Sequence, residues 1–141
     1  MAEMWEQNLC VTISVENLEP DYYYDQVYSS NHGQLFSGGW CADYPDPENF
    51  ADVLFHTGSA QNNGSYSNPQ LDALLEAART EQETTSRIGM YQQAEQMLVD
   101  DAAALFTTYS LSYQLVKPYV KGYVFTPIDI PIERYMWLEG K

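Results

Sequence analysis

Hydrophobic and polar positions in the first forty residues predict a β-α-β unit. Residues 1–8 resemble the last turns of a helix, and residues 10–16 alternate aliphatic with polar side chains, as a strand with one better-buried face does. Apolar side chains recur at helical spacing over residues 20–28, which predicts a short helix. Residues 34–40 return to extended character, so they complete the unit.

The middle of the chain predicts a helical hairpin. Prolines and glycines at residues 38–47 predict an irregular loop just past a strand end, and residues 48–55 predict a brief helix. Asn68 is placed to cap a helix that has Pro69 at its first position, and residues 85–100 predict a second helix. The apolar face predicted for the first helix of the hairpin consists of Leu71, Leu74, Leu75 and Ala78.

The C-terminal third is rich in strand-forming residues. Residues 105–116 hold many aromatic and aliphatic side chains, and short extended pieces are predicted at residues 123–125 and 135–138. The fold class is therefore α/β: a β-α-β unit, a helical hairpin and C-terminal strands. We expect one domain over residues 1–141, because this length can bury one modest core.

Charge and composition narrow the set of partners. Six Lys and Arg against 20 Asp and Glu give a net charge of -14, which repels phosphate backbones and anionic membrane surfaces and excludes nucleic acid. Hydrophobic residues at 45% and aromatics at 14% are typical of a chain that folds. We find no signal peptide and no apolar run of about 18 residues that could span a membrane.

The two cysteines, Cys10 and Cys41, match no zinc or redox spacing. They stand at opposite ends of two strands that are expected to run parallel, which separates them by roughly 20 Å against the roughly 7 Å that a disulfide allows between Cα atoms. We therefore predict two free thiols. Cys41 is expected to be a small buried hydrophobe.

Several segments together resemble a known family, the peptide-binding proteins of ABC importers (solute-binding family 5). The first is Gly39-Trp40-Cys41-Ala42-Asp43-Tyr44-Pro45-Asp46-Pro47. Others that match in the family's order are Tyr66 to Pro69, Leu71 to Leu75, Arg87 with Tyr91 to Gln96, and Leu115 to Gly122. The resemblance covers nearly all of the chain. It departs from the family at Phe106, where members usually have a proline.

This resemblance implies a C-terminal, partial lobe of a two-lobed solute-binding protein with a type II periplasmic-binding-protein fold. It implies extracytoplasmic or periplasmic binding of a peptide or other small solute, delivery to an ABC permease by the full-length protein, no cofactor and no enzymatic activity. The family also binds nickel complexes, heme, glutathione and oligosaccharides, so the ligand class stays open. The alternative is a truncated fragment or stand-alone domain that keeps the fold without binding.

The resemblance also identifies candidate ligand-binding residues. In family members with Trp-x-Ala-Asp, the aspartate matching Asp43 resembles the group that pairs with the free α-amino end of a peptide, and a buried ammonium needs such a carboxylate. The alternative is that Asp43 caps backbone amides of its own loop. Trp40 and Tyr109 could form flat apolar walls, although aromatics at strand ends more often belong to the core. Cys41 joins this set as the neighbour of Trp40. The alternative to a buried Cys41 is a disulfide with a partner in the part of the protein that the resemblance implies lies outside this chain.

Two other chemistries have weaker support. His32 and His56, with Asp43, Asp46 and Glu48 as oxygen ligands, lack the spacing that fixes a metal geometry, so polar surface residues are the ordinary explanation. Asp43 and Asp46 could form an acid-base pair if one had a raised pKa, but no serine-hydrolase or phosphate-loop motif accompanies them. We predict neither a metal site nor an enzyme.

The aromatic content predicts self-association. Three Trp, 12 Tyr and five Phe are many for 141 residues, and a partial lobe would leave some of them, and a sheet edge, uncovered. The charge of -14 opposes association, but salt screens it beyond about 8 Å. We expect a two-fold homodimer, because closed symmetric contacts bury such surface most simply.

Overall fold

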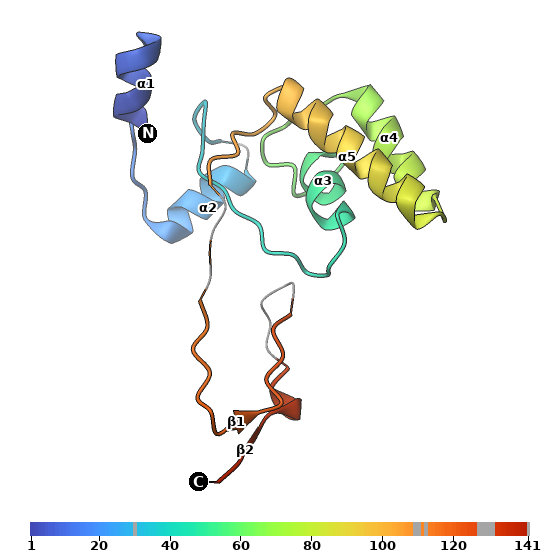
Figure 1. The fold of residues 1–141 in the computed structure, drawn as a ribbon. Helices are drawn as coiled ribbons and strands as arrows, with labels where there is room; N and C mark the ends of the chain where they lie inside the picture. The colour runs from blue at the N-terminus through green and yellow to red at the C-terminus, as the bar shows by residue number, and fades with distance from the viewer. Residues whose placement is uncertain (30, 109–110, 112, 127–131, 141) are drawn as a thin grey trace. The chain divides into compact units, whose positions relative to one another are not determined.

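The computed structural model describes residues 1–29, 31–108, 111, 113–126 and 132–140. Contacts divide the chain into two compact units, Met1–Phe36 and Ser37–Lys141. The first unit consists of helices joined by extended chain, and the second holds a cluster of helices and a short hairpin (Figure 1). None of the helices in the described part of the chain combines the length and apolar character that crossing a membrane requires.

The first unit contains helices α1 (Ala2–Leu9) and α2 (Pro20–Tyr28). Helix α2 begins at Pro20, since proline is favoured at the first position of a helix. Val27 is the buried residue of that helix. Cys10 directly follows the last residue of α1, and its backbone adopts a left-handed conformation with φ of 54°. Both helices lie where the sequence predicts them.

The two strands predicted around α2 are not formed among the described residues. A strand needs a neighbour for its backbone groups, and the amide of Ile13 instead donates to Glu6 Oε1 at 3.0 Å. Val11 and Val15, expected on the better-buried face, are 46% and 65% exposed. Alternating aliphatic and polar residues indicate extended chain, but a strand also needs a second segment to pair with. The β-α-β unit is therefore not confirmed.

The second unit contains helices α3 (Glu48–Phe55), α4 (Pro69–Thr80) and α5 (Thr84–Asp100), which contact one another (Figure 1). The predicted helical hairpin is α4 and α5. Their shared core consists of Ala51, Leu71, Leu75, Ala78, Tyr91, Ala94 and Leu98. The predicted apolar face of α4 therefore faces this core, with Leu74 partly buried against it.

Side chains cap both helices of the hairpin. Asn68 Oδ1 accepts hydrogen bonds from the amides of Gln70 at 2.9 Å and Leu71 at 3.3 Å, as the sequence predicts. Glu83 caps α5 in the same way, because its carboxylate accepts from the amides of Thr85 and Ser86. These bonds hold the pKa of Glu83 below its ordinary value.

A two-stranded antiparallel ladder pairs β1 (Val120–Lys121) with β2 (Trp137–Leu138), with the 3₁₀ helix η1 (Glu133–Tyr135) before β2. Gly122 follows β1 with φ of 72°, and a Cβ there would lie 1.9 Å from the Tyr135 carbonyl oxygen. This close approach requires glycine. The second extended piece was predicted correctly, but the first strand precedes its predicted position, and the described part of 105–116 holds no strand.

Candidate functional site

The candidate loop, residues 40–47, precedes α3 and is held by a buried amide in the first turn of that helix. Asn49 is 1% exposed, and its Oδ1 accepts hydrogen bonds from Trp40 Nε1 at 2.9 Å and from the backbone amide of Asp43 at 2.9 Å. Two residues predicted for the site are therefore brought together by a third that the sequence analysis did not single out.

A carboxylate-guanidinium pair fixes the other end of the loop. Arg87 of α5 donates two hydrogen bonds to the carboxylate of Asp46, both at 2.8 Å, and its guanidinium carbon lies 5.0 Å from the centre of the Tyr91 ring. Asp46 Oδ1 also accepts from the Glu48 amide at 2.9 Å, which supports the start of α3. The loop is thus anchored to both α3 and α5.

This anchoring decides what Asp46 can do chemically. Hydrogen bonds from Arg87, opposed by partial burial and assisted by the Glu48 amide, hold the pKa of Asp46 below its usual value. A general acid at neutral pH needs a raised pKa instead. Asp46 is therefore held as an anion of the loop and does not fit the role of the acid in the pair considered from the sequence.

The Asp43 side chain differs from that of Asp46. Its backbone amide is used by Asn49, but its carboxylate is exposed and has no hydrogen-bond or ion-pair partner within the described residues. It does not cap backbone amides of its own loop there, which was the alternative to a role in binding. The loop thus presents an unpaired carboxylate next to a fixed backbone position.

The remaining predicted residues have different fates. Trp40 is half-buried, with its indole nitrogen bonded to Asn49, and Tyr109 lies outside the described residues. Cys41 is exposed, so the expectation that it is a buried hydrophobe is wrong; it sits in the irregular loop and not at the end of a packed strand. Cys10 and Cys41 are both free, which confirms the prediction of two thiols, although the strands used to argue it are not formed.

Comparisons with known proteins give the family. No protein-family model matches the chain. The periplasmic oligopeptide-binding protein OppA of Salmonella typhimurium is 32% identical over 123 residues, which are 87% of this chain and 22% of that protein. The periplasmic murein peptide-binding protein MppA of Escherichia coli is 31% identical over 139 residues, 98% of this chain and 26% of that protein. The chain belongs to this family of peptide-binding proteins.

Solved structures agree with this assignment. The crystal structure of Haemophilus influenzae OppA in complex with RPPGFSPFR matches with a TM-score of 0.78 at 27% identity, over 99% of this chain and 27% of that one. The Escherichia coli murein tripeptide-binding protein MppA matches with a TM-score of 0.73 at 31% identity, over 99% and 27%. This chain matches the C-terminal part of its relatives and spans about a quarter of their length.

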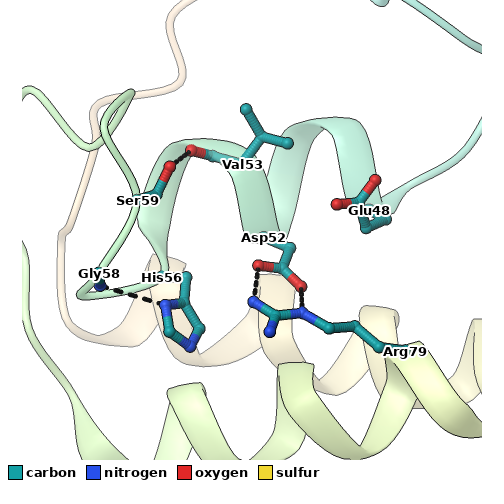
Figure 2. Close-up of a pocket in the computed structure, with 7 residues that line it drawn as sticks. All are labelled: Glu48, Asp52, Val53, His56, Gly58, Ser59 and Arg79. Carbon is teal, nitrogen blue, oxygen red and sulfur yellow. Dashed lines mark hydrogen bonds and ion pairs between the residues drawn. The ribbon is translucent and has the colours of Figure 1, made fainter.

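A hollow lies beside α3, with a volume of about 380 Å³ (Figure 2). Inside it Arg79 donates two hydrogen bonds to Asp52, at 2.6 and 2.7 Å, and His56 Nδ1 accepts from the Gly58 amide at 3.1 Å. The full lining is Glu48, Asp52, Val53, His56, Gly58, Ser59 and Arg79. Its main charges pair with each other, so it offers a ligand less than the exposed Asp43 carboxylate does.

The metal alternative finds no support in the geometry. His56 Nε2 lies 3.3 Å from Glu76 Oε1. In the first unit, the rings of His32 and Phe36 contact each other. Among the described residues no group of three or more His, Cys, Asp and Glu side chains could hold a metal ion. Both histidines have ordinary polar or aromatic neighbours.

Proposed function

We propose that this chain contributes one wall of the peptide site of an extracytoplasmic solute-binding protein serving an ABC importer, and that Asp43 pairs with the peptide's free α-amino group. The observation that carries the proposal is the exposed, unpaired carboxylate of Asp43 in a loop anchored by Asn49 and Arg87. A preorganised carboxylate suits an ammonium group, because a charge-assisted hydrogen bond both neutralises and orients it.

Relatives support a peptide as the ligand. Their names include oligopeptide-, murein peptide- and dipeptide-binding proteins, and one structure holds the peptide RPPGFSPFR. Another relative, 28% identical, is called a probable deoxycholate-binding protein. A bile acid carries a carboxylate, which the Asp43 carboxylate and the net charge of -14 would both repel, so a cationic amino terminus is the better fit.

Trp40, Cys41 and Tyr109 complete the proposed site as neighbours of the peptide's side chains. Trp40 supports this role most directly, because the same amide holds it and Asp43. An aromatic wall contacts many side chains without selecting one. In the full-length context the partner would be the ABC permease, and the location periplasmic or otherwise extracytoplasmic.

Self-association of the chain belongs to the same proposal. Large apolar side chains are exposed in both units, among them Leu35 at 65% and Phe106 at 69%. Such surface favours a homodimer over a monomer at high concentration. The sheet edge invoked from the sequence does not contribute, because the strands around α2 are not formed among the described residues.

Charge-removing variants test the role of Asp43. The chain, Asp43→Asn and the control Glu16→Gln, which removes a second exposed carboxylate, are titrated with the peptide Ala-Ala-Ala by NMR. We expect binding no tighter than about 0.1 mM, because one wall of the cleft cannot exclude water alone. Asp43→Asn should weaken it about fivefold, as expected for an exposed ion pair, and Glu16→Gln should not.

Two results would contradict the proposal. Equal affinities for the chain and Asp43→Asn would show that Asp43 does not contact the amino group. No binding to the chain at millimolar peptide would favour the alternative, a fragment that keeps the fold without binding.

A further inference from the structure

We propose that Asn49 is a positioning residue for peptide binding, whose side-chain amide fixes Trp40 and Asp43 relative to each other before a ligand arrives. The inference rests on the proposed function, because it concerns the same loop. Its basis is geometric: one buried oxygen accepts both the Trp40 indole N–H and the Asp43 backbone N–H, each at 2.9 Å.

The side-chain oxygen of Asn49 is directed to the loop. A carbonyl oxygen has two lone pairs and can accept two hydrogen bonds. Asn49 Oδ1 accepts one from Trp40 and one from the amide of Asp43. The Tyr44 hydroxyl donates to Glu48, which raises the pKa of Tyr44, while a side-chain hydrogen bond with Asn49 lowers it in part. Asn49 therefore holds two residues of the loop, Trp40 and Asp43, through one oxygen.

Regular secondary structure does not hold this part of the loop. Residues 40–43 have no backbone hydrogen bonds to each other or to a neighbouring strand among the described residues, and the nearest such bond runs from the Asp46 amide to the Tyr44 carbonyl. Arg87 anchors the loop at Asp46. The earlier half depends on Asn49.

Other residue types would fill position 49 less well. The side chain is 1% exposed, so an apolar replacement would leave two donors without an acceptor. Fixing these donors before binding lowers the entropy lost when a peptide orders the loop. Losing Asn49 should therefore weaken binding even though the residue need not touch the peptide.

Three variants separate positioning from general destabilisation. Asn49→Ala removes the acceptor, and Asn49→Asp keeps an acceptor oxygen in either protonation state. Asn62→Ala is the matched control, because Asn62 is half-buried in the same unit and makes three hydrogen bonds, to the His56 carbonyl and to the carbonyl and amide of Tyr66.

The first readout needs no ligand. The NMR signal of the Trp40 indole N–H and the hydrogen-exchange rate of the Asp43 amide are measured in each variant that circular dichroism shows to be folded. Asn49→Ala should shift the indole signal and speed exchange at Asp43, whereas Asn49→Asp and Asn62→Ala should change neither. Unchanged signals in folded Asn49→Ala would overturn the inference. If Asn49→Ala does not fold, hydrogen exchange in the unchanged chain decides: slow exchange of the Trp40 indole and Asp43 amide protons supports positioning, and exchange of both as fast as in an unstructured peptide overturns it.

The second readout is the affinity for Ala-Ala-Ala. The affinity of Asn49→Ala for the peptide should be about tenfold lower, which corresponds to one ordinary hydrogen bond. Asn62→Ala should bind as the unchanged chain does. If Asn49→Ala loses its loop signals but keeps its affinity, positioning for binding is refuted while the proposed function stands. If the unchanged chain binds no peptide, the proposed function fails, and the ligand-free signals still show whether Asn49 holds the loop.

Discussion

The pair formed by Asp52 and Arg79 should respond unequally to removal of its two members. Asp52 is 5% exposed at its side chain and Arg79 is 45% exposed, with bonds of 2.6 and 2.7 Å between them (Figure 2). Arg79→Met leaves a carboxylate buried without a cation, whereas Asp52→Asn leaves a guanidinium that water can reach. The cost of the pair therefore depends on which charge is left behind.

The magnitudes follow from that difference in exposure. Removing one member of a buried pair lowers the free energy of unfolding by about 3 to 5 kcal/mol. Because Arg79 is partly exposed, we expect Arg79→Met to cost about 3 kcal/mol, at the lower end of this range. Asp52→Asn keeps the shape and loses one charge-assisted bond, about 1.5 kcal/mol. The double variant has no unpaired carboxylate, so it should be more stable than Arg79→Met alone.

Urea unfolding followed by circular dichroism measures these effects. With a slope of about 2 kcal/mol per molar, Arg79→Met should lower the midpoint by about 1.5 M and Asp52→Asn by about 0.75 M. The interpretation would be refuted if Arg79→Met were no more destabilising than Asp52→Asn, or if the double variant were the least stable of the three.

Three further predictions concern the cap, the acid dependence and the assembly. Asn68→Ala should lower the free energy of unfolding in urea by about 1 kcal/mol and Asn68→Ser should not, since serine still caps; equal losses would argue against capping. Because Arg87 keeps the pKa of Asp46 low, the stability it provides is complete above about pH 4 and is lost as the pH falls through that lowered pKa. Asp46→Asn should therefore make unfolding less pH-dependent below about pH 4, and an unchanged acid profile would contradict this. Light scattering after size exclusion should show a mass above the 16.1 kDa monomer at high concentration, and a monomer throughout would rule out the homodimer.

The helices could be predicted because their signals are local. Asn68 and Pro69 mark the start of α4 by capping chemistry, and the spacing of Leu71 and Leu75 gives the face that packs in the core. The strands could not be predicted in the same way. Residues 10–16 have the composition of a strand, but no segment among the described residues pairs with them. A strand depends on distant chain in a way that a helix does not.

The candidate site was predictable only in part. The resemblance to peptide-binding proteins singled out Asp43 and Trp40, but periodicity did not suggest that one side chain would hold both. Asn49 falls in a helical segment where a polar residue is normally solvent-exposed, and its burial depends on the path of the preceding loop. The prediction that Cys41 is buried was wrong for the same reason, because the exposure of its side chain depends on the path of the loop and not on residue type.

The dependence of binding on a free α-amino group tests the central claim most directly. The unchanged chain is titrated by NMR with Ala-Ala-Ala and with its N-acetylated form, in which a neutral acetamide replaces the charged amine. If Asp43 pairs with that amine, the free peptide should bind about fivefold more tightly, and its largest shift changes should fall on the loop at residues 40–47. Equal affinities, or changes that avoid this loop, would contradict the account.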